Sequence, residues 1–441
     1  MPDSLSRWTD WLGRWINTVN AFQFFQLFRS GTAILISIVL AKSSLAVGDI
    51  AVYEWLLYMG AFVSFFWVNA LLQALLPMYP QLEKTLRKPF LSNVYGLFCL
   101  LSLLLVSMLY IAPSFWTTLL TGQEELPYFH WYLLFLLVNL PTSLVEYLYL
   151  LEERSPQIVG YGAVSFGSYF VAVVTAVWLG WGLEGAIQGM VIVGLLRFLW
   201  LSHLTAPWKH WSWQGPSMKA YLVLGAPLVL YSFLAGFAQM FDQWLVGWYF
   251  EEREPFAIFR YGARELPLAT ALAGGLSAAL IPEVSKNLRG SLDMVRAKSL
   301  RIYHWLFPFS IVLMLTSPYL YPWVYSPEFA PSARIFNLYL LLVASRVLMP
   351  YSLLMGLKQT KVILSISILE LSINIALSLW WIDSYGLEGI ALATVVAFLF
   401  EKLVMILYLY FRHGIRPGQY IPLLWYGGYV VLLLLAYVIS I

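Results

Sequence analysis

Charged residues are scarce in this chain of 441 residues. Asp, Glu, Lys and Arg together make up only 11% of it, whereas soluble domains carry about 25%. Hydrophobic residues make up 61%, and the mean hydropathy is +0.74. This composition excludes a soluble globular protein and predicts an integral membrane protein. The net charge of +3 is too small and too dispersed to indicate nucleic-acid binding.

Residues that carry redox, metal and nucleotide chemistry are equally rare. Cys99 is the single cysteine, which excludes an intramolecular disulfide. The five histidines show no metal-ligand spacing. The sequence has no phosphate-binding glycine-lysine loop, no dinucleotide fingerprint and no nucleophile elbow. We therefore expect no cofactor, no ATP hydrolysis within this chain and no enzymatic activity.

The chain does contain an internal repeat. Gly182-Leu183-Glu184-Gly185 recurs as Gly386-Leu387-Glu388-Gly389, and the same offset of 204 residues aligns Pro127 with Pro331 without a gap. A repeat of this size in so apolar a chain predicts two related halves. Transporters are commonly built this way, because alternating access needs two bundles that can rock about a site between them.

Long apolar runs predict thirteen membrane spans, since a span needs about 20 apolar residues. The first twelve form two sets of six, and an even number per set gives both halves the same orientation. We expect an all-α polytopic membrane protein with two six-helix bundles related by a pseudo-twofold axis along the membrane normal. The predicted segments are an N-terminal cytoplasmic or interfacial segment (1–20), an N-lobe (21–204), a cytoplasmic linker (205–219), a C-lobe (220–411) and a thirteenth span (412–441).

Basic residues in the loops predict the orientation. With the N-terminus inside, cytoplasmic segments hold seventeen basic residues, and the outer loops hold only Lys42 and Arg253. This is the positive-inside pattern. It predicts a cytoplasmic N-terminus, a cytoplasmic loop at 282–301 and a C-terminus on the periplasmic or extracellular side.

The remaining seven basic residues fall inside predicted spans. A charge at mid-membrane costs about 2.5–3.5 kcal/mol on insertion scales, so it is usually paired or functional. Arg260 and Arg264 are four residues apart and would share one helix face. Two neighbouring cations need an anion between them, and the planar fork of arginine suits phosphate. We predict that these two residues, with Arg29 and Arg346, bind an anionic head group. The alternative is that Arg260 snorkels to the interface while Arg264 pairs with an acid on another span.

Three acidic residues within spans are candidates for ion coupling. Glu146 lies in the middle of a span near Pro141, Asp242 near an outer end, and Glu370 in the eleventh span. Burial of a carboxylate favours its protonated form, so such a group can carry a proton. Sodium is the other ion considered. The alternative for each is a helix cap or a structural partner for an arginine.

Several short segments occur in the order typical of polysaccharide exporters. They are Phe256–Ala263, Ile281–Ser285, Ser326–Ala330 and Leu354–Lys361, together with the two Gly-Leu-Glu-Gly turns. The chain therefore resembles the O-antigen (Wzx-type) flippases of the multidrug/oligosaccharidyl-lipid/polysaccharide (MOP) flippase superfamily. It departs from their pattern at Ala257 and Phe259, where Gly and Tyr are usual, and in having thirteen predicted spans instead of twelve or fourteen.

The resemblance implies a V-shaped pair of lobes around a central cavity. It also implies a cargo, a polyprenyl-diphosphate-linked oligosaccharide, moved from the inner to the outer leaflet of the bacterial inner (cytoplasmic) membrane. Cell-surface polysaccharide, lipopolysaccharide or O-antigen biosynthesis would be the process served. The implied partners are this cargo, membrane lipids, H⁺ or Na⁺ and polysaccharide-assembly proteins.

Three other functions stay open. A multidrug antiporter of the same superfamily would be expected to have an acidic cavity for cationic cargo, which the seven intramembrane cations disfavour. A peptidoglycan-precursor (lipid II) flippase would be expected to have fourteen spans. A multi-span polysaccharide polymerase or ligase typically carries a large outer loop with catalytic residues. The longest outer loop here, residues 112–128, has no histidine and two glutamates.

The predicted orientation can be tested by cysteine labelling. In a Cys99→Ser background, Lys286→Cys should be protected from an impermeant thiol reagent added to intact cells, because the 282–301 loop is predicted to be cytoplasmic. Glu252→Cys should be labelled under the same conditions. Labelling of the cysteine at position 286 from outside would refute the orientation.

Overall fold

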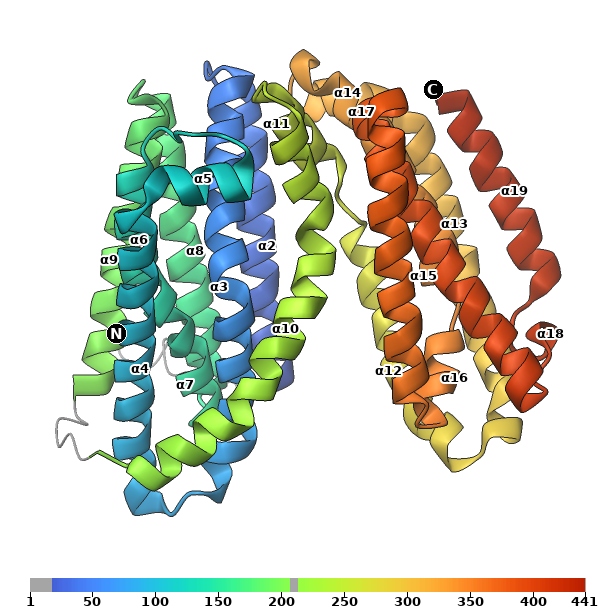
Figure 1. Ribbon diagram of the computed structural model, residues 1–441, viewed down its shortest axis with the longest axis horizontal. Helices are drawn as coiled ribbons and strands as arrows, with labels where there is room; N and C mark the ends of the chain where they lie inside the picture. The colour runs from blue at the N-terminus through green and yellow to red at the C-terminus, as the bar shows by residue number, and fades with distance from the viewer. Residues whose placement is uncertain (1–17, 207–212, 441) are drawn as a thin grey trace, which may run out of the picture. The chain divides into compact units, whose positions relative to one another are not determined.

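The computed structural model describes residues 18–206 and 213–440, and within this part every regular element is a helix. The expectation of an all-α membrane protein is therefore confirmed (Figure 1). The predicted N-terminal segment lies almost entirely outside the described residues, as does the middle of the predicted linker.

The described chain forms two compact units. The first comprises residues up to Met240 together with Gly247–Glu254, and the second comprises Phe241–Val246 together with Pro255–Ile441. The long helix α10 (Gly215–Tyr249) contributes to both. The lobe boundaries given above stay a prediction.

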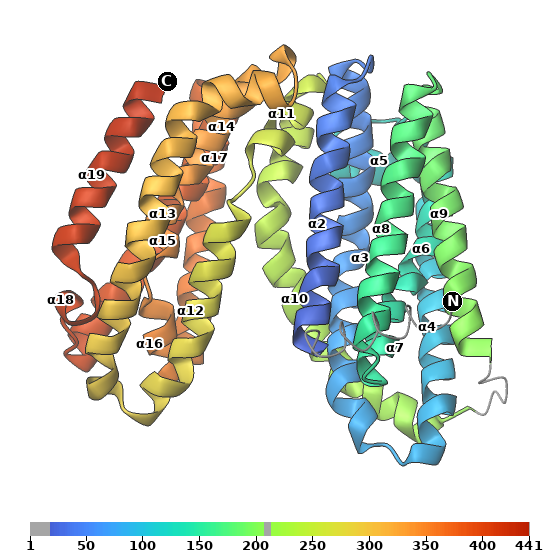
Figure 2. The same ribbon diagram turned by 180° about the vertical axis from the view of Figure 1, so that it is seen from behind.

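The first unit contains eight α-helices before α10 and one 3₁₀ segment. They are α2 (Thr18–Lys42), α3 (Val47–Gln81), α4 (Lys84–Ile111), α5 (Pro113–Thr121), α6 (Phe129–Asn139), η1 (Leu140–Leu144), α7 (Val145–Leu151), α8 (Ser155–Trp178) and α9 (Gly182–Thr205). Helix α8 lies between α2 and α9, and α6 packs against α9 and α4 (Figures 1 and 2). Trp55 and Tyr58 of α3 are fully buried and fill the core of this unit.

The second unit follows α10 in the chain. Its elements are α11 (Glu254–Gly262), α12 (Pro267–Lys286), α13 (Leu288–Val324), η3 (Pro327–Phe329), α14 (Ala330–Leu341), α15 (Val343–Arg346), α16 (Pro350–Gly356), α17 (Thr360–His413), α18 (Pro417–Tyr420) and α19 (Leu423–Ser440). The last helix, α19, packs along α13 and also touches α14 (Figure 2). Asn337 of α14 donates a hydrogen bond to Ser440 of α19 over 2.9 Å, so the thirteenth predicted span is an integral part of this unit.

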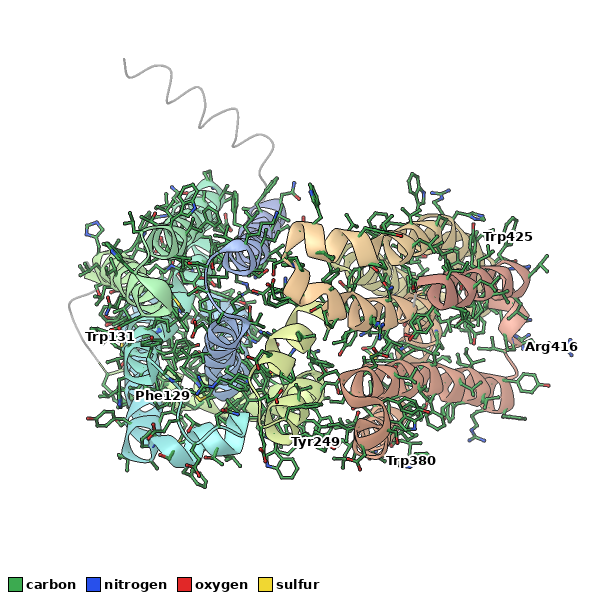
Figure 3. All side chains as sticks on the ribbon, turned by 90° about the horizontal axis from the view of Figure 1, so that it is seen from above. Phe129, Trp131, Tyr249, Trp380, Arg416 and Trp425 are labelled. Carbon is green, nitrogen blue, oxygen red and sulfur yellow. The ribbon has the colours of Figure 1, made fainter. Side chains whose placement is uncertain are left out.

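Large apolar side chains cover the periphery. Trp131 is 40% exposed, Trp380 70% and Trp425 51%, and Figure 3 shows each of them at the edge of the molecule. In water such a surface would be costly, whereas hydrocarbon tails and the interface solvate it. The exposed apolar surface is thus the one expected for a protein embedded in lipid.

Among the described residues, ten helices are long and apolar enough to span a membrane, or eleven if one bent pair counts as a span. Each of the thirteen predicted spans nevertheless has a helical counterpart. The eleventh and twelfth spans, predicted at 362–382 and 387–410, are merged in α17. The eighth, predicted at 257–281, is broken into α11 and α12. The tenth, predicted at 331–356, is the bent pair formed by α14–α15 and α16. The difference from thirteen therefore reflects one merged pair and two interrupted spans.

The repeat is visible in the backbone. Gly182 has φ +63° and Gly386 has φ +56°, and these two residues are separated by the repeat offset of 204. Gly386, at ψ −132°, is the break that divides the 54 residues of α17 into two helices. Only glycine adopts such a conformation readily. The first glycine of each Gly-Leu-Glu-Gly turn thus has a positive φ, and at Gly386 the backbone requires glycine.

Substitution of Gly386 should destabilise the second unit. We expect Gly386→Ala to lower the free energy of unfolding by about 1–3 kcal/mol, because alanine is strained at this φ and ψ. Gly160→Ala is the matched control, since a Cβ at this position of α8 meets no heavy atom within 4 Å, and it should be neutral or slightly stabilising. Thermal unfolding of the detergent-purified variants measures both. Equal melting temperatures for the two variants would contradict the assignment.

Candidate functional site

Two membrane spans are interrupted at equivalent positions of the repeat. In the first unit, α6 ends at Asn139, and the 3₁₀ segment η1 separates it from α7. The offset of 204 maps η1 onto residues 344–348. In the second unit, α15 ends at Arg346 within this range, and α16 begins at Pro350 with a bend of 42°. Interrupted helices in corresponding halves of a transporter point to the binding site, so the side chains at these breaks are the first candidates.

The break in the first unit is held by Arg197 of α9. Its Nη1 donates to Oδ1 of Asn139 over 3.0 Å, and its Nη2 donates to the carbonyl oxygen of Ser165 over 2.9 Å. The guanidinium also lies over the rings of Phe166 and Tyr169, at 5.1 and 5.5 Å. Arg197 is one of the seven basic residues that fall inside predicted spans. Its contacts show that it anchors the end of α6.

Glu146 lies directly after the same break and is only 7% exposed. The positive charges that act on its carboxylate are those of Arg29 and Arg197. Arg29 belongs to α2 and is exposed. The structure therefore brings together two of the predicted site residues, Arg29 and Glu146, within the first unit.

A further interruption in the second unit was not predicted. Helix α11 ends at Gly262, residues 263–266 are not helical, and α12 begins at Pro267. Proline restricts the residue before it to extended conformations, and Leu266 accordingly has φ −62° and ψ +116°. A Cβ on Gly262 would lie 2.6 Å from the carbonyl oxygen of Ser332, so only glycine allows the close approach of α11 to α14.

The expectation that Arg260 and Arg264 share one helix face is therefore wrong. Arg260 lies on α11, and its Nη1 donates to Oε1 of Gln243. Arg264 lies in the non-helical stretch, with its guanidinium 5.0 Å from the centre of the Tyr261 ring and its Nη1 3.5 Å from the hydroxyl of Tyr325. The two guanidinium groups are positioned by different elements, although the Nε of Arg264 still reaches the carbonyl oxygen of Arg260 at 3.4 Å.

Arg346 is bound by an acid from this unpredicted break. Its Nε donates to Oε2 of Glu265 over 3.0 Å, and its Nη2 donates to Oε1 over 2.5 Å. The face of the guanidinium lies 4.3 Å from the centre of the Phe398 ring. Both charged side chains are 27% exposed. The sequence carries no signal for this partner, because the contact joins two helix breaks that are 81 residues apart in the chain.

Asp242 is buried in a polar cluster of the second unit. Its Oδ2 accepts hydrogen bonds from the hydroxyl of Tyr339 over 3.1 Å and from that of Thr394 over 2.5 Å. Asn374 in turn donates to Thr394 over 3.0 Å. Among the buried oxygens of the described residues that have no hydrogen-bond partner are Oδ1 of Asp242, Oδ1 of Asn374 and Oγ of Ser378. Buried polar atoms are usually satisfied, so these oxygens have the capacity to bind a proton or a hard cation.

Glu370 lies on α17, near a buried ion pair. The Nζ of Lys402 is 2.6 Å from Oε2 of its sequence neighbour Glu401, and Ser367 donates to the other oxygen of Glu401 over 3.4 Å. Glu401, Lys402, Asp242 and Arg346 are the ionic groups that act on Glu370. Asp242, the second predicted coupling residue, is thus one of the charges that act on Glu370. Among the described residues no group of three His, Cys, Asp or Glu side chains has the arrangement of a metal site.

Comparison with known proteins agrees with this architecture. The family model described as "Polysaccharide biosynthesis protein" matches residues 81–334, which is more than half of the chain. The matched range includes Glu146, Asp242 and the break that carries Arg264, and it ends before Arg346. No curated protein sequence matches the chain.

Several solved structures share the fold. The lipid II flippase MurJ in an inward closed conformation has a TM-score of 0.68 at 16% identity, with 96% of this chain and 97% of that chain covered. An inward-facing multidrug resistance transporter of the MATE family has a TM-score of 0.62 at 12% identity, with 90% and 98% covered. A MOP superfamily transporter from Pyrococcus furiosus has a TM-score of 0.57 at 12% identity, with 89% and 94% covered.

These structural similarities establish that the chain has the fold of these proteins, which are a lipid II flippase and transporters of the MOP superfamily. The sequence match establishes the family. The chain belongs to the polysaccharide biosynthesis protein family and has the MOP-superfamily fold.

Proposed function

We propose that this protein flips a polyprenyl-diphosphate-linked oligosaccharide from the inner to the outer leaflet of the bacterial cytoplasmic membrane. The oligosaccharide would serve cell-surface polysaccharide or O-antigen synthesis, with polysaccharide-assembly proteins acting on it afterwards. The family match and the MOP-superfamily fold support a flippase of lipid-linked cargo. The observation that carries the choice of cargo is the set of arginines at helix breaks of the second unit.

The geometry of this set suits a diphosphate. Arg264 and Arg346 flank two different breaks, and Arg260 lies one turn before the first. Backbone that is not helical is tolerated at membrane depth only where protein or water satisfies it, so these breaks border an interior polar region. Phosphate oxygens accept paired hydrogen bonds from arginine forks. Arg29, which belongs to the first unit, stays a proposed head-group residue.

Arg264 is proposed to contact the diphosphate of the cargo. We expect Arg264→Ala to lower export by about 10- to 100-fold, because a hydrogen bond to a charged group is worth about 1.5–3 kcal/mol. Arg264→Lys should recover part of the export, since it keeps the charge and loses the planar fork. Export of the lipid-linked glycan in cells and the amount of protein in the membrane are measured together.

The matched control is Arg334→Ala. Arg334 is also an arginine at a predicted span, but it forms an exposed ion pair with Glu388 at 3.6 Å, and exposed pairs contribute little. It should leave export unchanged. Full export by the Arg264→Ala variant would place the head-group site elsewhere.

Because the sequence shows no ATP-binding motif, we expect uphill transport to draw on an ion gradient or on consumption of the cargo outside. We propose that an ion gradient supplies the energy through Glu146, Asp242 or Glu370, with Glu146 favoured as a proton carrier. Burial of Glu146 after a helix break supports this role, and the unpartnered Oδ1 of buried Asp242 supports a proton or sodium ion there. A carboxylate can carry an ion only if both its charged and its neutralised states are accessible.

Reconstituted protein tests the coupling. We expect Glu146→Gln to retain binding of the cargo and to make transport insensitive to an imposed proton gradient, because glutamine cannot take up the proton. Asp242→Asn and Glu370→Gln are assayed in parallel under proton and sodium gradients. Glu184→Gln, on the exposed surface of α9, should respond as the wild type does. If wild-type transport ignores both gradients, the coupling role is wrong.

A second candidate cargo is lipid II, favoured by the similarity to MurJ. Both cargos carry a polyprenyl diphosphate, so the arginine site does not discriminate between them. Complementation does: the gene should restore surface polysaccharide in a strain that lacks its own flippase for that glycan, and it should fail to rescue depletion of the lipid II flippase. The reverse result would favour lipid II.

A further inference from the structure

The arginine proposed to bind a diphosphate already binds an anion of the protein itself. Glu265 presents both carboxylate oxygens to the Nε and Nη2 edge of Arg346, at 3.0 and 2.5 Å. That edge is the fork with which arginine binds phosphate. Phe398 covers one face of the same guanidinium at 4.3 Å, so the orientation of the fork is fixed. Any lipid head group that uses this edge must first displace Glu265.

Glu265 is placed so that displacement is feasible. It belongs to the non-helical stretch between α11 and α12, so its backbone is not part of a regular helix. Its side chain is 27% exposed, as is that of Arg346. Opening a fully buried ion pair is costly because it leaves an uncompensated buried charge. The pair of Glu265 and Arg346 is partly exposed, so this cost is smaller. The carboxylate can therefore exchange for another anion at Arg346.

We propose that Glu265 is a specificity-determining residue. Its carboxylate, tethered by the chain, occupies the Nε and Nη2 edge of Arg346, excludes singly charged lipid head groups from that edge and is displaced by a diphosphate. This inference rests on the proposed function and adds the residue that excludes competing lipids. A tethered group acts at an effective concentration on the order of millimolar. An incoming head group must bind strongly enough to overcome that competition.

Charge decides which head groups can do so. A phosphodiester lipid such as phosphatidylglycerol has one negative charge and replaces one carboxylate by one phosphate at Arg346, with little net gain. A diphosphate has a second charged phosphate, and we propose that this phosphate contacts Arg264, the sequence neighbour of Glu265 in the same stretch. The anionic phospholipids that surround the protein in large excess are thereby kept from the site.

A purely structural role for the ion pair makes the opposite prediction. If Glu265 only tied the two helix breaks together, its removal would loosen the arginines and weaken binding of every anionic ligand. If Glu265 instead competes with the ligand for Arg346, its removal should strengthen binding of the ligand. The direction of the change in affinity therefore separates the two roles.

The experiment measures binding of farnesyl diphosphate to the full chain in phosphatidylcholine nanodiscs. We expect Glu265→Gln to bind it about tenfold more tightly than the wild type. As phosphatidylglycerol replaces phosphatidylcholine, the apparent affinity of Glu265→Gln should fall, while that of the wild type should change little. Glu283→Gln is the control, because Glu283 forms an exposed pair with Lys286 outside the site, and it should match the wild type.

Each outcome bears on one proposal. Weaker or unchanged binding by Glu265→Gln, or an equal effect of phosphatidylglycerol on both proteins, overturns the role of Glu265 alone. Failure of the wild type to bind farnesyl diphosphate more tightly than uncharged farnesol overturns the proposed function itself. If Glu265→Gln is not recovered as folded protein, Glu265→Asp replaces it. Its shorter side chain should lose the two-point contact and show the same changes to a smaller extent, and wild-type behaviour would refute the proposal.

Discussion

Every backbone amide and carbonyl inside the hydrocarbon core must find its hydrogen-bond partner within the protein, because lipid offers none. In this chain the constraint leads to helices throughout the described residues. It also makes each interruption costly, so an interruption that persists has to be supported by side chains or lie beside a polar interior. The three interrupted spans, at 140–144, 263–266 and 347–349, hold three of the seven candidate residues: Glu146 follows the first interruption, Arg264 lies in the second beside Glu265, and Arg346 precedes the third.

The low dielectric of the hydrocarbon core also makes each charged side chain within it costly unless it has a partner. Unpaired ions are costly at membrane depth. In this structure Arg346 pairs with Glu265, Lys402 pairs with Glu401, and Arg197 donates to a side-chain amide and a backbone carbonyl. These solutions differ in kind. The contacts of Arg197 are with neutral groups that stay in place, whereas Glu265 carries a charge that a ligand can replace.

The repeat relates the two units without making them alike. Equivalent breaks occur in α6–α7 and α14–α16, and equivalent glycines with positive φ begin the two Gly-Leu-Glu-Gly turns. The side chains at the equivalent breaks differ, however, since residue 142 is threonine where its counterpart is Arg346, and Glu146 corresponds to Pro350. A shared backbone geometry thus carries an acid in one unit and a base in the other, which suits an ion site and a head-group site held by one architecture.

The sequence by itself determined the class of protein, the positions of the helical segments and the internal repeat, because hydropathy and the offset of 204 residues depend only on composition and order. It also identified charged residues within predicted spans, which are usually paired or functional: Arg29, Glu146, Asp242, Arg260, Arg264, Arg346 and Glu370. Only the tertiary structure decided which of them have partners. Arg346 meets Glu265, and Asp242 meets Tyr339 and Thr394, across 81, 97 and 152 residues of chain. Apolar periodicity contains no information about such contacts.

The break after Gly262 was missed for a related reason, because the apolar segment predicted as a span at 257–281 continues across it. The break arises from the close approach of α11 to Ser332 and from the restriction that Pro267 places on the residue before it.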